Sequence, residues 1–330
     1  MFIEEFWHMQ RIKRDGGQST AGVVVIDQPG VIRGRRLFKA ERVLALQAYA
    51  FLLPSFLGLL VFSLIPIVAV AVISFFNWGL LGQPTFVGLK NYSLMFGSSS
   101  FWHSLLLTLY YVLLNIPMQT VFALLLALLL NQKIPGRGIF RTLFVVPWMA
   151  TAVAMGIVWQ WVFDPQYGTL NTFLSLFHIT GPAWLSSTAW AMPSIAAVNI
   201  WQYTGYNMLF FLAGLQGIPP DFYEAASLDG ASPVQKFFTI TLPLLSPTMF
   251  FVLVTDIIGS AQVFDTVYVM TQGGPGNATT VLNFTIFQQA FEFFHAGYAS
   301  ALSMALFALL LIVTLIQVLF FRSRTIYDLS

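Results

Sequence analysis

The sequence predicts an all-α integral membrane protein with six transmembrane helices. Three observations support this: the composition is apolar, six stretches are long enough to cross a bilayer, and the basic residues gather on one side of the resulting topology. Hydrophobic residues make up 57% of the 330 residues and charged residues only 8%, whereas soluble domains carry roughly 25% charged residues. Such a composition excludes a soluble enzyme and indicates lipid as the solvent.

Six apolar stretches reach the roughly 20 residues that a spanning helix needs. They are expected at residues 46–76, 105–130, 139–163, 190–216, 244–270 and 297–321. Prolines fall inside or near the ends of several stretches, which membrane helices tolerate when neighbouring helices satisfy the freed backbone groups. The first stretch begins past residue 42 and is too long for the core of a signal peptide, so we expect no cleavable signal.

The basic residues set the orientation, because cytoplasmic connections are enriched in Lys and Arg. With the N-terminus in the cytoplasm, 14 of the 15 Lys and Arg residues lie on the cytoplasmic side, and only Lys90 falls outside. An even number of spans returns the C-terminus to the cytoplasm. The expected parts of this multi-pass protein of the cell (inner) membrane are a cytoplasmic tail over 1–43, a first transmembrane helix over 44–77, a core of five transmembrane helices over 104–321, and a cytoplasmic tail over 322–330.

The fourth connection, residues 217–243, holds the most informative local pattern. Two prolines end the preceding helix, and a new helix is expected to begin near Pro220. Gly230 suits the left-handed position that follows the end of that helix. Ser232 and Pro233 are typical of an N-cap followed by proline at the first helical position. The connection therefore predicts a helix, a glycine turn and a second helix on the cytoplasmic face, an element suited to docking on another protein.

The same connection resembles the EAA signature of binding-protein-dependent ABC permeases. In that pattern EAA is followed by three residues, glycine, nine residues, isoleucine, one residue and Leu-Pro. The matching residues are Glu224, Ala225, Ala226, Gly230, Ile240, Leu242 and Pro243. Segments 86–92, 141–147, 262–265 and 271–275 are also similar to the carbohydrate branch, which contains the maltose and glycerol-3-phosphate permeases. The resemblance covers about residues 45–322 and implies the type I ABC importer permease fold.

The resemblance also implies the partners of this chain. They are a second homologous permease, two copies of an ABC ATPase, an extracellular or periplasmic substrate-binding protein and membrane lipid, with no nucleic acid. ATP and Mg would be bound by the ATPase, and no cofactor is expected in this chain. The residues that would couple this chain to the ATPase are Glu224, Ala225, Ala226, Asp229, Gly230, Leu242 and Pro243.

Catalytic motifs are not found. A P-loop needs lysine directly after glycine, and none of the lysines here follows glycine, so ATP hydrolysis is expected from a separate subunit. The four histidines are widely spaced and show no paired metal-ligand pattern such as H-E-x-x-H. No G-x-S-x-G elbow is present either. We therefore expect neither catalytic residues nor a metal site.

Polar residues of the fourth span are candidates for a substrate pathway. Asn199, Gln202, Tyr203 and Tyr206 follow i, i+3, i+4, i+7 spacing and form one helix face. Amides hydrogen-bond hydroxyl groups, and flat aromatic faces pack against sugar rings. A polar seam between helices is the alternative interpretation.

The fifth span adds two acids, Asp256 and Asp265, and ionisable residues inside a membrane are functional candidates because lipid makes them costly. On a continuous helix, a separation of nine residues places them on opposite sides, so they are not expected to line one cavity. Gln262 shares the face of Asp265, and both are expected at the cavity or the outer gate. Asp256 is expected to bond to the partner subunit or a neighbouring helix. Each acid is alternatively explained as a polar contact between helices.

Together these features predict the permease subunit of an ATP-driven importer for a neutral sugar or polyol. No Lys or Arg falls in the middle or outer part of any span, so an anion would lack a compensating positive charge there. Two alternatives stay open: the same importer class for glycerol phosphate, and a secondary transporter driven by an ion gradient. The second leaves the EAA pattern without a purpose, and an intramembrane enzyme would lack a recognisable catalytic set.

Overall fold

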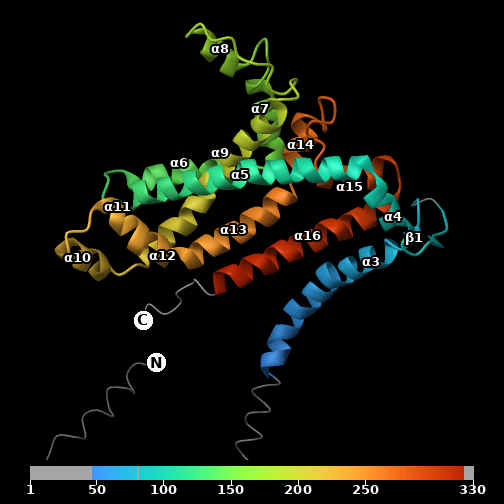
Figure 1. The fold of residues 1–330 in the computed structure, drawn as a ribbon, viewed down its shortest axis with the longest axis horizontal. Helices are drawn as coiled ribbons and strands as arrows, with labels where there is room; N and C mark the ends of the chain where they lie inside the picture. Colours follow the sequence, from blue (N-terminus) through green and yellow to red (C-terminus); the bar gives the residue numbers. More distant parts are fainter. Residues whose placement is uncertain (1–46, 80–81, 323–330) are drawn as a thin grey trace, which may run out of the picture. The chain divides into compact units, whose positions relative to one another are not determined.

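A computed structural model describes residues 47–79 and 82–322, which are mainly helical (Figure 1). Within these residues four helices are long and apolar enough to cross a membrane: Gln47–Ile73, Ser99–Asn131, Ser246–Met270 and Ala296–Arg322. The bent pair Arg137–Met149 and Ala152–Val162 is a fifth candidate. The all-α membrane prediction is therefore confirmed, with four or five candidate spans by length and composition. The predicted tail over 1–43 and nearly all of the tail over 322–330 lie outside the described residues.

The chain divides into two units, residues 1–63 and residues 64–330, and the elements below belong to the second unless stated. The first span contains a π-helical turn, η1 (Leu60–Leu64), which crosses the unit boundary, and continues in α3 (Ile65–Ile73). The remaining elements are β1 (Phe76–Asn77), β2 (Thr85–Phe86), α4 (Lys90–Gly97), α5 (Ser99–Asn131), α6 (Arg137–Met149), α7 (Ala152–Val162), α8 (Thr169–Ser175), α9 (Ala191–Gln216), α10 (Pro220–Leu228), α11 (Pro233–Lys236), η2 (Phe237–Thr241), α12 (Leu242–Leu244), α13 (Ser246–Ala261), α14 (Asp265–Met270), α15 (Leu282–Phe287), η3 (Gln288–Glu292) and α16 (Ala296–Arg322). The two short strands pair antiparallel, with Phe76 opposite Phe86.

Helix α9 lies at the centre of the packing and buries 15 of its 26 residues. Its buried face carries polar residues such as Asn199 and Asn207, and for this reason it is less apolar than the candidate spans. Small residues bring its neighbours close. Ala123 and Ala127 of α5 are fully buried, and Gly205 faces the backbone of Phe144 in α6. Close backbone packing of this kind is typical of membrane helices.

The third predicted stretch is not one continuous helix, which corrects the prediction for 139–163. Helices α6 and α7 meet at an angle of 97°. Ala150 and Thr151 are both extended at the junction, and the Thr151 hydroxyl accepts a hydrogen bond from the backbone of Ala154, which starts α7. The carbonyl of Ala150, which the bend removes from the helical ladder, accepts a hydrogen bond from the Gln202 amide of α9 at 3.0 Å. A buried amide from another helix thus stabilises the bend.

The fifth predicted stretch is broken as well. Helix α13 ends at Ala261 and α14 begins at Asp265, with Phe264 in a non-helical conformation between them. The carbonyl of Gln262 accepts a hydrogen bond from the side chain of Asn283, 2.8 Å away. As at the first break, a side-chain amide from a distant part of the chain hydrogen-bonds the freed carbonyl. A membrane helix needs such a partner wherever its backbone hydrogen bonds are interrupted.

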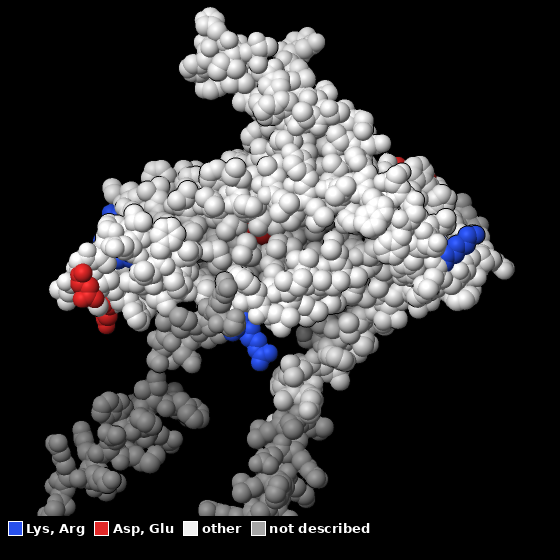
Figure 2. All heavy atoms as spheres, in the orientation of Figure 1, with Lys and Arg blue, Asp and Glu red and all other residues white. Residues whose placement is uncertain are grey.

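Charged side chains of the described residues gather toward the ends of the longest helices. In the view of Figure 2, acidic groups lie over α10, and a basic group lies near α4 at the opposite end. The face between them is mostly uncharged. Such an uncharged face is what contact with lipid hydrocarbon or with another apolar protein surface requires.

Candidate functional site

The predicted helix–turn–helix over 217–243 is present. Helix α10 begins at Pro220 and ends before Gly230, whose φ is +76°. The backbone N–H of Ala231 bonds the carbonyl of Ala226 at 2.9 Å, and the N–H of Gly230 bonds the carbonyl of Ser227 at 3.1 Å. These two bonds form a Schellman motif, which favours glycine at the left-handed position. The prediction for Gly230 is confirmed.

The second helix of this element starts as predicted. Ser232 is the N-cap of α11, and a reciprocal pair of hydrogen bonds with Gln235 completes a capping box. The Lys236 ammonium donates to the Ser227 hydroxyl at 2.6 Å, and the hydroxyls of Tyr223 and Thr241 lie 3.0 Å apart. These contacts tie α10 to the following helix, so the element is held in one conformation.

The surface of this element combines exposed apolar and acidic groups. Leu228 is 90% exposed, and Val234 and Phe238 are exposed as well. Among the predicted coupling residues, Glu224, Ala225, Asp229, Gly230 and Pro243 are exposed, and Ala226 and Leu242 are half-buried. An exposed apolar patch rimmed by polar residues on a preformed element is typical of a protein–protein contact.

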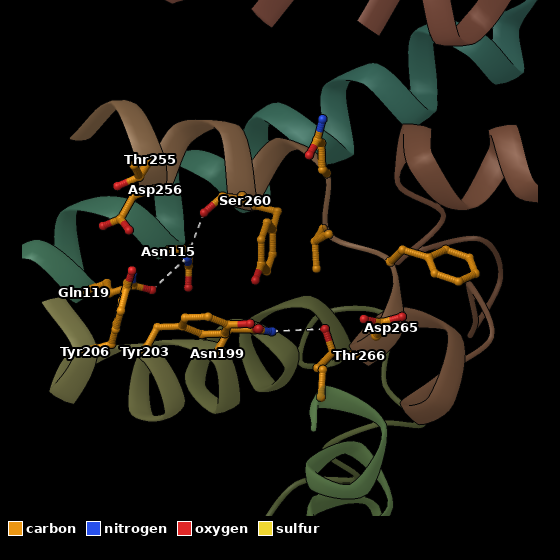
Figure 3. A pocket seen from close by; sticks show the side chains of 16 residues that line it. Asn115, Gln119, Asn199, Tyr203, Tyr206, Thr255, Asp256, Ser260, Asp265 and Thr266 are labelled. Atoms are coloured by element: carbon orange, nitrogen blue, oxygen red, sulfur yellow. Dashed lines mark hydrogen bonds between the residues drawn. The ribbon is translucent and has the colours of Figure 1, made fainter. Parts of the chain in front are cut away.

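A polar cavity of about 230 Å³ lies between α5, α9, α13 and the start of α14 (Figure 3). Five of the six predicted pathway residues line it, namely Asn199, Tyr203, Tyr206, Gln262 and Asp265. Tyr206 stacks on Trp148 of α6, with ring centroids 4.4 Å apart. Asn199 donates to the Thr266 hydroxyl at 3.1 Å. The fold therefore brings together residues of two predicted spans around one space.

Gln202 is the exception among the predicted residues. It is almost fully buried, and its amide donates to the Ala150 carbonyl at the α6–α7 bend. It is not among the residues that line the cavity. Its spacing from Asn199, Tyr203 and Tyr206 predicted that it would share their face of α9. It instead contacts the backbone at the end of α6.

The expectation that Asp256 and Asp265 do not share a cavity is wrong. Both line it, because the helix is interrupted between Ala261 and Asp265, so the helical phase is not carried across the break. Gln262 and Asp265 likewise do not share one helix face. The Asp256 carboxylate accepts a hydrogen bond of 2.6 Å from Asn207 of α9, in agreement with the expected bond to a neighbouring helix.

Helix α5 contributes residues that the sequence analysis did not single out. Tyr111, Asn115 and Gln119 all line the cavity. They recur every four residues along α5, and this spacing indicates one polar face of the helix. Among the described residues that line the cavity there is no Lys, Arg or His, whereas two carboxylates are present. The lining can accept many hydrogen bonds and has no positive side chain to offer an anion.

Comparison with known proteins identifies the class of this fold. Residues 119–326 match the family described as binding-protein-dependent transport system inner membrane component. The chain belongs to this family. It is thus the permease subunit of an ABC importer, a multi-pass inner membrane protein, and not itself an ATPase. It serves a transport system that depends on a binding protein.

Several relatives place the permease in the carbohydrate branch. The trehalose/maltose transport system permease protein MalF of Thermococcus litoralis is 34% identical over 84% of this chain and 94% of its own length. The arabinooligosaccharides transport system permease protein AraP of Bacillus subtilis is 35% identical over 82% of this chain and 86% of its own length. A crystal structure of a bacterial ABC transporter that imports the acidic polysaccharide alginate contains a similar chain. It has a TM-score of 0.77 and 25% identity, and the match covers 88% of this chain and 100% of the other.

Proposed function

We propose that this permease translocates a neutral sugar or a polyol through the cavity of Figure 3. The observation that carries the proposal is the charge of the lining, which holds Asp256 and Asp265 and, among the described residues, no basic side chain. An anionic cargo in this low-dielectric space would meet like charge and lose its hydration without compensation. Hydroxyl groups instead donate to carboxylates and amides.

The aromatic residues support the same class of cargo. Tyr203 and Tyr206 lie on one face of α9 and line the cavity, and the stacking of Tyr206 on Trp148 holds its ring in place. Flat rings pack against the apolar faces of sugar rings. Trehalose, maltose and arabinooligosaccharide permeases among the relatives agree with a carbohydrate. The structurally similar alginate importer carries an acidic polysaccharide, so structural similarity does not indicate a neutral cargo. The proposal that the cargo is neutral therefore rests on the residues that line the cavity of this chain.

For the membrane topology we propose six spans with both termini in the cytoplasm. They would be Gln47–Ile73, α5, the bent pair α6–α7, α9, α13 with α14, and α16. Helix α9 brings the number of spans from five to six. Its length supports this, because its 26 residues rise about 39 Å. The proposed parts are then the cytoplasmic tail 1–43, the first helix within 44–77, the core 104–321 and the short tail 322–330.

For the energy source we propose that two copies of an ABC ATPase, carrying ATP and Mg, dock beneath this chain and a second homologous permease. In each permease the docking element would be the segment 217–243, with Glu224, Ala225, Ala226, Asp229, Gly230, Leu242 and Pro243 as the coupling residues. Its exposed apolar surface and its fixed Schellman turn support this role. Closure of the ATPase pair would then move α10 and, through it, the helices around the cavity.

The test uses the complete transporter, reconstituted in vesicles with its ATPase, second permease and cognate binding protein. A calorimetric screen of the binding protein against neutral sugars, polyols, glycerol phosphate and carboxylated sugars is followed by uptake of each ligand. We expect uptake of neutral compounds and binding-protein-stimulated ATP hydrolysis, with no hydrolysis by the purified single chain. Transport of glycerol phosphate or a carboxylated sugar, with neutral sugars ignored, would overturn the proposal. Uptake driven by an ion gradient without ATP would favour the secondary transporter.

A further inference from the structure

We infer that Asn115 of α5 determines specificity by accepting a hydrogen bond from one hydroxyl group of the cargo through its side-chain oxygen, Oδ1. The inference rests on the proposed function and deepens it. It adds a residue of α5 to the predicted pathway residues of α9. The hydrogen bonds around Asn115 carry the argument.

Asn115 is 3% exposed and lines the cavity. Its nitrogen, Nδ2, donates to the Ser260 hydroxyl at 3.0 Å and to the Gln119 oxygen at 3.2 Å. No donor from the described residues reaches Oδ1. Figure 3 shows this oxygen on the side away from Ser260, directed toward Tyr203 across the cavity. A buried acceptor without a partner destabilises a structure, so it is normally filled by a ligand or by water.

The orientation of the Asn115 amide follows from its neighbours. The Gln119 oxygen faces the Asn115 nitrogen at 3.2 Å, and the Ser260 hydroxyl faces the same nitrogen at 3.0 Å. With the nitrogen held by these two groups, Oδ1 lies on the opposite side of the amide (Figure 3).

The free oxygen selects for a donor at one position of the cargo. A site built to hydrogen-bond a hydroxyl group rejects the analogue that lacks it, because the buried oxygen then stays unpaired. Asn115→Leu has similar volume and removes this oxygen. It should therefore abolish the discrimination at one hydroxyl position and leave the discrimination at all other positions intact. A residue with a structural role alone would change uptake of every analogue by the same factor.

The experiment measures ATP-driven uptake by the complete reconstituted transporter. Wild type is first tested with a panel of neutral mono- and disaccharides that includes trehalose and maltose. The best-transported sugar and each of its monodeoxy analogues are then compared in wild type, Asn115→Leu and Asn115→Asp. The Asp variant is the matched control, because it keeps an acceptor oxygen facing the cavity, and the Gln119 amide can present its nitrogen to the second carboxylate oxygen. Size-exclusion chromatography checks assembly, and Asn115→Ala replaces the Leu variant if that variant does not assemble.

We expect wild type to take up one monodeoxy analogue at least tenfold more slowly than the parent sugar. Asn115→Leu should take up that analogue and the parent equally, and Asn115→Asp should keep the difference. An unchanged set of ratios in Asn115→Leu, or equal uptake of all analogues by wild type, would overturn the inference alone. A wild-type transporter that imports neither a neutral sugar nor a polyol would reject the proposed function and, with it, the inference.

Discussion

Gly205 tests the packing that holds the cavity-lining helices in place. A Cβ atom at this position would overlap the carbonyl group of Phe144 and lie 3.0 Å from the backbone nitrogen of Val145. These are backbone atoms, which cannot rotate away, so Gly205→Ala must push α6 from α9. Overpacking costs up to about 3 kcal/mol, and alanine in a helix recovers about 1 kcal/mol relative to glycine. The net loss is about 2 kcal/mol, or roughly a 30-fold fall in the folded-to-unfolded ratio.

The assay is the thermal midpoint of the assembled transporter, followed by chromatography, with sugar uptake measured on the same preparation. Gly138→Ala is the matched control, because it lies in α6 and an added Cβ meets no atom within 4 Å. We expect a lower midpoint and slower uptake for Gly205→Ala, and an unchanged or higher midpoint for Gly138→Ala. If both variants have the same thermal midpoint, at or above that of the wild type, the predicted contact between Gly205 of α9 and the backbone of α6 is refuted.

Three further changes test the docking element and the cavity. Gly230→Asp should abolish uptake with normal membrane insertion, since the left-handed turn costs a side chain about 1–2 kcal/mol, and Gly230→Asn should keep more activity; equal uptake by both would contradict this. Asn207→Leu removes the 2.6 Å bond to Asp256 and should cost about 1.5–3 kcal/mol, partly recovered by adding Asp256→Leu; an unshifted thermal midpoint would count against it. Ser232→Ala removes the cap of α11 and should cost about 1 kcal/mol, seen as weaker binding-protein-stimulated ATP hydrolysis on warming, and retention of full stimulation would oppose it.

Much of the site was predictable where the signal is local. The turn at Gly230 and the cap at Ser232 depend on residues within a few positions of each other, and both are found as expected. The face of α9 that carries Asn199, Tyr203 and Tyr206 was also predictable, because α9 is an uninterrupted helix. The face of α5 was equally readable from the spacing of its polar residues.

The errors lie where a span is interrupted. Helical periodicity relates two residues only while the helix continues, and it failed between Asp256 and Asp265 because α13 ends before α14 begins. Whether a membrane helix can break depends on partners for the freed carbonyl groups. Those partners are Gln202 for Ala150 and Asn283 for Gln262, and in each pair the donor lies on a different segment from the break.

The sequence by itself determined the solvent, the number of apolar stretches, the predicted orientation and the form of the docking element. These features depend on the number of apolar and basic residues in a segment, or on turn residues a few positions apart. They can therefore be predicted without knowing which distant segments are in contact. Only the tertiary structure decided that Asp256 and Asp265 share a cavity, that Gln202 leaves it, and that Asn115 presents a free oxygen to it. These outcomes depend on contacts between segments far apart in the chain, such as Gln202 with Ala150 and Asn115 with Ser260, and such contacts leave no periodic trace in the sequence.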